Sequence, residues 1–253
     1  APAISHQATE YSALGEALAF GGSAVKYRFA MFESIHFNSK GRATTNASKR
    51  EVIGALRAIV GDENVLVEPE KVEPYGADAV KEKFPPEAVV FPEITSHVVA
   101  ILKLANEYLF PVTARGGGVG YTGGAVPIDG GIVIGTDRMN KIIEINVDDL
   151  YAICQPGIRT IELQQAVEKQ GLMFAPDPAS YKDSFIGGNI AENAGGMRTP
   201  KYGVTKHHAL GLEVVERAAD QAGRVGVLDQ AGAKGHRAGN ADADRAARAG
   251  LEF

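Results

Sequence analysis

Two glycine-rich stretches contain the residues of this chain that are best suited to bind a ligand. The first reads PVTARGGGVGYTGGAVP and covers residues 111–127. A glycine-dense loop lets backbone N–H groups approach a ligand closely, and successive N–H groups form a concave anion site. Arg115 adds a fixed positive charge. We therefore predict a cradle for a pyrophosphate, with a mobile surface linker as the alternative.

The flanks of this stretch favour the cradle over the linker. A segment with helical periodicity precedes it, and the buried-strand pattern of residues 132–134 follows it. No Gly-Lys-Ser/Thr follows the glycines, so the stretch is not a P-loop. Gly116 and Gly118 lack the third glycine of the dinucleotide fingerprint at the required offset. The sequence thus predicts a phosphate site of a different kind.

The second glycine-rich stretch, FIGGNIAENAGG, covers residues 185–196. It is either a second backbone surface against the same ligand, or a pair of tight turns around a helix of small residues. About seventy residues separate the two stretches, and both are flanked by predicted strands. We therefore favour one extended ligand that both stretches share.

Other chemically capable side chains have simpler interpretations. Cys154 lies in an apolar run, so we predict a buried structural thiol rather than a nucleophile. As the single cysteine, it excludes an intramolecular disulfide and indicates a reducing compartment. His207 and His208 are expected to be solvated loop histidines rather than catalytic ones. No catalytic residue is assigned, and no metal site is expected.

The composition is that of a globular protein with a net charge of −5 and scattered basic residues, which argues against a nucleic-acid partner. No apolar run is long enough to span a bilayer, and there is no clear signal peptide. We expect a cytoplasmic location, free or peripheral to the inner face of the membrane. The chain starts at Ala1 without a methionine, so we expect a fragment or a processed product.

The patterns that must position the glycines are mostly short strands and amphipathic helices. A strand at 88–91, a helix at 95–108 capped by Thr95, and a strand at 112–114 fit a parallel crossover. This unit places the first glycine stretch at the carboxyl end of a strand, where open α/β sheets bind ligands. Further helices are predicted at 49–60 and 161–170, and further strands at 132–134, 142–145, 150–154, 172–174 and 210–215.

Six motifs in a fixed order carry a family resemblance. They are residues 111–127, TDRMNKI at 136–142, QPG at 155–157, PDPAS at 176–180, residues 185–196 and KYG at 201–203. Their order resembles the flavin-binding domain of the FAD-linked oxidases of the vanillyl-alcohol-oxidase (PCMH) type. The branch that holds the flavin-binding chain of glycolate oxidase and the D-lactate dehydrogenases looks closest, and the resemblance covers roughly residues 50–215.

The resemblance implies an α+β fold and a cofactor. The fold is a PCMH-type FAD-binding domain of two α/β subdomains, one with a small parallel-containing sheet and one with a mixed or antiparallel sheet, incomplete at the C-terminus. The pyrophosphate of FAD would be held by backbone N–H groups of Arg115, Gly116, Gly117, Gly118, Val119, Gly120, Thr122, Gly123 and Gly124. The second side of the flavin would be lined by Pro176, Ser180, Gly187, Gly188, Asn193 and Gly195. Some relatives bond the flavin to a histidine of the first loop, and since this loop has none, non-covalent FAD is expected.

The resemblance also implies a reaction. The expected activity is that of an FAD-dependent oxidoreductase acting on CH–OH groups, in which a small 2-hydroxy acid of the D-lactate or glycolate type gives a hydride to flavin N5. The electron acceptor is not indicated. The alternatives are a non-catalytic FAD-binding subunit that needs a partner chain, and an inactive truncated fragment.

The expected domain organisation has three parts. Residues 1–47 form a weakly structured extension, residues 48–215 form an incomplete FAD-binding domain, and residues 216–253 form a low-complexity tail. Few large apolar residues occur in that tail, so we do not expect a packed core there. Either a change of reading frame or a natural flexible tail would account for it.

Overall fold

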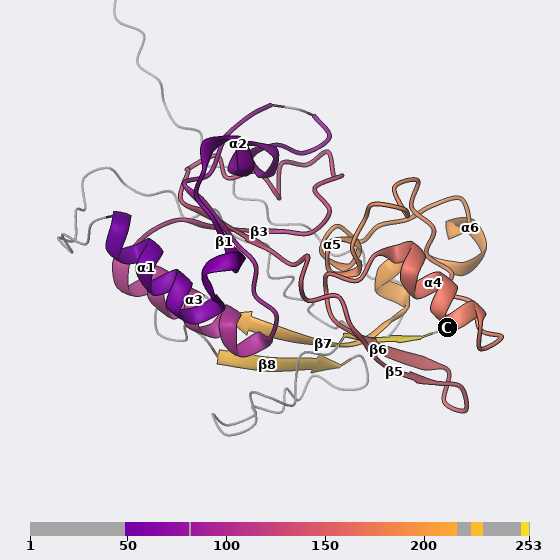
Figure 1. Cartoon of the computed structure of the whole chain (residues 1–253). Coiled ribbons are helices and arrows are strands. Elements are labelled where there is room, and N and C mark those ends of the chain that lie inside the picture. Colours follow the sequence, from indigo (N-terminus) through magenta and orange to yellow (C-terminus); the bar gives the residue numbers. More distant parts are fainter. Residues whose placement is uncertain (1–48, 81, 217–223, 230–248, 253) are drawn as a thin grey trace, which may run out of the picture. The chain divides into compact units, whose positions relative to one another are not determined.

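A computed structural model of the chain describes residues 49–80, 82–216, 224–229 and 249–252 (Figure 1). Two sheets, here called sheet A and sheet B, organise these residues. The prediction for residues 1–47 and the expected cap Ser48 lie outside the described residues.

Sheet A has four strands in the order β1-β2-β4-β3. The strands are β1 (Val65–Leu66), β2 (Ala88–Val90), β4 (Ile132–Gly135) and β3 (Val112–Arg115). β4 pairs in parallel with β2 and with β3, and β1 pairs antiparallel with β2. The first glycine stretch therefore leaves the carboxyl end of β3, as predicted, and returns to the parallel neighbour β4.

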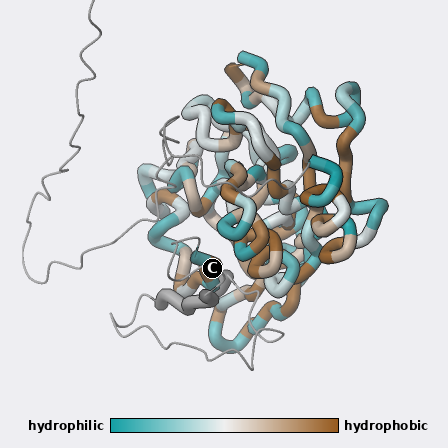
Figure 2. The backbone as a smooth tube through the Cα atoms, turned by 90° about the vertical axis from the view of Figure 1, so that its left-hand side faces the viewer, coloured by the Kyte–Doolittle hydropathy of each residue, from teal (hydrophilic) through white to brown (hydrophobic). Residues whose placement is uncertain are grey.

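Both faces of sheet A are covered by other elements. Successive residues of β2 point to opposite faces, so each packs against a different set of elements. Ala88 and Val90 pack on one side with the helices α1 (Lys49–Val60) and α3 (Thr95–Tyr108), which lie side by side in Figure 1. Val89 packs on the other side, in a cluster with Val72 of α2 (Pro69–Val72) and Tyr75 of the short 3₁₀ helix η2 (Glu73–Gly76). A strand buried on both faces reads as a continuous apolar run, as residues 88–90 do. Figure 2 shows the hydropathy along the whole backbone, with brown hydrophobic and teal hydrophilic stretches.

Sheet B is antiparallel, with the order β5-β6-β9-β7-β8. Its strands are β5 (Ile142–Asn146), β6 (Tyr151–Cys154), β9 (Ala249–Glu252), β7 (Ala209–Glu216) and β8 (Arg224–Asp229). The chain between β6 and β7 contains four helical elements: α4 (Thr160–Glu168), α5 (Ile186–Ala191), α6 (Thr199–Tyr202) and the 3₁₀ helix η3 (Thr205–His207). The core beside sheet B contains Ala152, Cys154, Ile158, Leu163, Val167, Phe174 and Ile186.

Three details differ from the sequence-based expectations. Residues 172–174 form no strand, because the Leu172 amide closes the end of α4 on the Val167 carbonyl and Phe174 is buried in the core beside sheet B. Ile94, not Thr95, is the N-cap of α3. In the predicted low-complexity tail, β8 and β9 pair with β7 and β6. Backbone pairing does not need large side chains, which is why composition gave no signal for these two strands. The rest of the tail after Glu216 lies outside the described residues.

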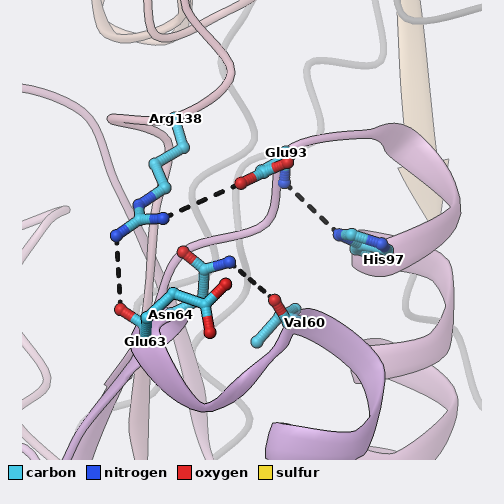
Figure 3. Close-up of polar contacts among 6 residues, drawn as sticks. All are labelled: Val60, Glu63, Asn64, Glu93, His97 and Arg138. Atoms are coloured by element: carbon cyan, nitrogen blue, oxygen red, sulfur yellow. Dashed lines mark hydrogen bonds and ion pairs between the residues drawn. The ribbon is translucent and has the colours of Figure 1, made fainter.

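The turn after β4 is fixed by a group of polar contacts (Figure 3). Arg138 donates to the Glu63 carbonyl over 3.2 Å and forms an ion pair of 3.7 Å with Glu93. The Gln155 side chain donates to the carbonyl of the same Glu93 over 3.1 Å. These contacts connect the carboxyl edge of sheet A with the start of sheet B. Among the described helices, none is both long and apolar enough to cross a membrane.

Candidate cofactor site

Arg115, the last residue of β3, holds the first glycine stretch from behind. Its guanidinium donates to the carbonyls of Ala77 over 2.7 Å, Pro74 over 3.3 Å and Ala125 over 3.5 Å. It also lies 5.7 Å from the ring centroid of Tyr75. Burial lowers the pKa of Arg115. The charges of neighbouring groups raise this pKa to a smaller extent, and Asp137 has the largest effect among them. The Arg115 guanidinium is therefore bound by protein carbonyls, and Arg115 also lines the cavity described below; its contribution to an anion site stays a prediction.

Gly118 allows the loop to fold over this guanidinium. Its φ of +65° is disfavoured for L residues, and a Cβ at this position would overlap the Arg115 side chain. Only glycine therefore meets both the backbone and the packing requirement here.

Consecutive backbone N–H groups of this loop are left without protein partners. Within the described part of the chain, none of the amides of residues 116–122 donates to a protein acceptor. The next amide, that of Gly123, donates to the Asp78 carboxylate over 3.0 Å. Unpaired amides in sequence are the donors of a backbone-built anion site. The loop thus divides into a free limb, residues 116–122, and an anchored limb at Gly123.

The second glycine stretch forms α5 and the turns after it, so it contains the helix of small residues that we considered as the alternative. A buried polar network fixes this helix. The side-chain amide of Asn189 donates through Nδ2 to Thr160 Oγ1 over 2.6 Å, and the hydroxyls of Thr160 and Ser184 are 2.9 Å apart. The Gly187 amide donates to the Pro156 carbonyl over 2.8 Å. The position of α5 is therefore set by side chains of sheet B's own subdomain.

The structure brings the two glycine stretches together. A Cβ on Gly116 would lie 3.5 Å from Phe185 Cβ and 3.7 Å from Gly188 Cα. Further along, Thr122 Oγ1 and Glu192 Oε1 form a hydrogen bond of 2.9 Å. The two stretches, far apart in sequence, are therefore neighbours from the start of the free limb to its end.

Parts of both stretches remain open to a ligand. A Cβ built on Gly120, Gly123 or Gly188 would meet no atom within 4 Å. The backbone at these three positions is therefore accessible to a ligand. That the ligand is a dinucleotide stays a prediction.

Of four other predicted residues, Pro176, Ser180 and Asn193 accept hydrogen bonds, and the fourth, Gly195, is closely packed. The Pro176 carbonyl accepts from Gln164, and the Ser180 carbonyl accepts from the amides of Asp183 and Ser184. Asn193, with a φ of 50°, accepts from the Lys206 amide over 3.0 Å. A Cβ on the fourth, Gly195, would lie 3.0 Å from Thr199 Oγ1. No hydrogen bond among the described residues joins Pro176 or Ser180 to the first loop.

Gly116 and Gly117, at the start of the free limb, line part of a cavity of about 690 Å³. Its lining residues are Pro74, Tyr75, Arg115, Gly116, Gly117, Asp137, Asn140, Gly157, Arg159, Glu162, Asp183 and Phe185. Burial raises the pKa of Asp137, and Arg115 lowers it to a smaller extent. Asp137 Oδ2 is buried without a hydrogen-bond partner among the described residues. Sequence patterns had not pointed to Tyr75, and Asp137 was noted only as part of the motif at 136–142, because only the fold brings these residues to Arg115.

The histidines and the cysteine have structural roles. His207 Nδ1 accepts from the Val204 amide over 3.2 Å, and His208 Nε2 lies 3.0 Å from the Tyr202 carbonyl oxygen. Cys154 is fully buried, and burial raises the pKa of its thiol to about 12. The prediction of a buried structural thiol is confirmed.

Comparison with known proteins gives matches of two kinds. Residues 86–221 match the family described as FAD binding domain. The chain is 46% identical over 130 residues to the glycolate oxidase subunit GlcD of Bacillus subtilis, covering 51% of this chain and 28% of that protein. It is 39% identical over 170 residues to the D-2-hydroxyglutarate dehydrogenase of Stutzerimonas stutzeri, covering 67% of this chain and 37% of that protein.

Among solved structures, alkyldihydroxyacetonephosphate synthase matches with a TM-score of 0.66 at 21% identity, over 81% of this chain and 40% of that chain. This likeness concerns the fold alone, and it confirms the predicted α+β architecture of two subdomains. The chain spans two fifths or less of the length of each of these three proteins.

Proposed function

This chain belongs to the FAD binding domain family, and we propose that it binds FAD non-covalently as the cofactor-binding part of an oxidoreductase acting on 2-hydroxy acids. One observation supports this most directly. The amides of residues 116–122 donate to no described protein acceptor, and their loop approaches the second glycine stretch at Gly116 and Thr122. We further propose that residues 48–215 form the FAD-binding domain, which is incomplete.

The free limb of the loop supplies what a pyrophosphate needs. Amides in sequence give several hydrogen bonds to a doubly charged group, and bonds to charged acceptors are the stronger ones. Since the Arg115 guanidinium already binds three carbonyls, the anion would be held by backbone rather than by a cation. This is why glycines, which let the backbone come close, are concentrated there.

The second stretch would contact the other side of the cofactor. Gly188 is open, while Gly187 and Asn189 are fixed by hydrogen bonds to Pro156 and Thr160. This surface is therefore rigid before the ligand arrives, which lowers the entropy lost on binding. Residues 116–124 contain no histidine that could bond the flavin, so we propose that FAD is held by non-covalent contacts only.

Bound FAD would supply a hydride acceptor for the carbinol carbon of the substrate. A base must also take the proton of the substrate hydroxyl. His207 and His208 both contact backbone groups in their loop, so we propose that neither is this base. The similar protein from Bacillus subtilis is named as a subunit. Accordingly, we propose that a partner chain or a further segment completes the substrate site, and that the chain alone turns over little.

The visible spectrum of the purified chain tests the proposal. After incubation with FAD and removal of free cofactor, we expect a yellow protein whose flavin is released by denaturation, as non-covalent binding requires. Glycolate, D-lactate and D-2-hydroxyglutarate are then added in turn, and slow or absent bleaching is expected without a partner. A colourless protein after reconstitution would overturn the cofactor assignment, and flavin that stays attached after denaturation would overturn the non-covalent mode.

A further inference from the structure

A short segment that precedes β2, residues 74–80, lies behind the first glycine loop and holds it at several points. The carbonyls of Pro74 and Ala77 accept hydrogen bonds from Arg115, at the start of the loop. The Ala79 amide donates to the Gly120 carbonyl over 3.1 Å. The loop is thus attached to this segment through the Gly120 carbonyl and Arg115, while its amides at 116–122 donate to no acceptor among the described residues.

Asp78 makes the attachment at the far limb. Its Oδ2 accepts from the Gly123 amide over 3.0 Å, and its Oδ1 accepts from the Val80 amide over 2.8 Å. The second bond closes a local turn and fixes the carboxylate. Gly123 has a φ of +79° and no atom within 4 Å of a Cβ position, and its carbonyl accepts from the Val126 amide over 3.0 Å. The carboxylate is the contact that holds the Gly123 amide on the side of residues 74–80.

We propose that Asp78 is a positioning residue for the glycine loop. It binds Gly123 from behind and so aims the neighbouring amides toward the ligand. The proposal rests on the proposed function, because it assumes that these amides receive the pyrophosphate of FAD. Asp78 itself does not touch the cofactor.

The sign of a mutational effect separates positioning from simple charge. A carboxylate near a binding site for a dianion weakens binding by repulsion, so its removal alone would strengthen FAD binding. If the carboxylate instead orders the loop, its removal weakens binding, because the free loop must lose conformational entropy to bind. Asp129, an exposed aspartate beyond the anchored limb, provides a matched charge control.

The first measurement is the FAD dissociation constant of the full chain, from quenching of flavin fluorescence. We expect Asp78→Ala to raise the dissociation constant about tenfold. Asp78→Asn, which keeps an oxygen acceptor, should raise it about threefold. Asp129→Asn should stay within about twofold of the wild type. If Asp78→Ala does not fold, Asp78→Asn decides. Unchanged or tighter binding in the Asp78 variants that fold would overturn the proposal.

The second measurement is hydrogen exchange in the peptide that covers residues 116–124, without FAD. Faster exchange is expected in Asp78→Ala, because the Gly123 amide loses its acceptor, and a smaller increase in Asp78→Asn, whose neutral oxygen is a weaker acceptor than the carboxylate. Asp129→Asn should exchange like the wild type. Equal exchange in all variants would refute the role of Asp78. A wild-type chain that binds no FAD would refute the proposed function instead, and the exchange comparison would still decide on Asp78.

Discussion

Gly117 and Asp183 touch through their backbones: a Cβ on Gly117 would overlap the Asp183 carbonyl oxygen. Gly117 lies in the loop between β3 and β4, and Asp183 lies just before α5. The contact therefore joins the first glycine stretch, where its free limb begins, to the residues just before the second stretch. It sets the spacing between the two surfaces that we propose for the cofactor.

Replacing Gly117 should separate these surfaces. Gly117→Ala inserts a methyl group into backbone that cannot yield cheaply, so we expect a loss of about 1–3 kcal/mol in the free energy of unfolding, measured with urea. Gly120→Ala is the matched control, because its methyl group meets no atom within 4 Å. The control should unfold like the wild type and yet bind FAD at least about fivefold more weakly, since the ligand needs that space. Equal stability of Gly117→Ala and the wild type would contradict the contact.

Glu192 places a negative charge beside the loop that we propose for a dianion. Its carboxylate accepts from Thr122 and lies 3.2 Å from the Cβ position of Gly124. Glu192→Gln keeps the acceptor and removes the charge, so we expect FAD to bind about three- to tenfold more tightly, and the gain should shrink at high salt. Glu107→Gln, an exposed site on α3, should leave the dissociation constant unchanged. Weaker binding by Glu192→Gln would mean that the charge is required.

Arg115 should matter for stability before it matters for the ligand. Arg115→Met removes the donors to three carbonyls, and we expect a loss of about 2–4 kcal/mol in the free energy of unfolding. Arg115→Lys keeps the charge but not the fork of donors, so it should recover less than half of that loss. Arg50→Met, at an exposed position on α1, controls for the loss of a surface charge. Full recovery by lysine would show that charge, not geometry, is what the site needs.

The sequence located the elements better than it located their contacts. Periodicity predicted α1 and α3 with the bounds that the structure gives, because an amphipathic face is a local property. The family and the fold class, predicted from six ordered motifs, are confirmed. The direction of the Arg115 side chain was not predictable, because its partners at Pro74 and Ala77 lie far away in sequence. Asp78 gave no signal for the same reason. Which residues contact the cofactor stays a prediction.

Cys154 should make the stability of the protein depend on pH in the alkaline range. Burial raises the pKa of its thiol from 9.0 to about 12. The unfolded chain then ionises first, so the contribution of the thiol is complete below pH 9 and is lost as the pH rises toward 12. Each pH unit within that window should cost the wild type about 1.4 kcal/mol relative to Cys154→Ala. Urea unfolding of both proteins between pH 8 and pH 11, at about one-unit intervals, measures this difference and cancels the titration of tyrosines and lysines. Parallel pH profiles would show that the thiol is not shielded from water in the folded protein.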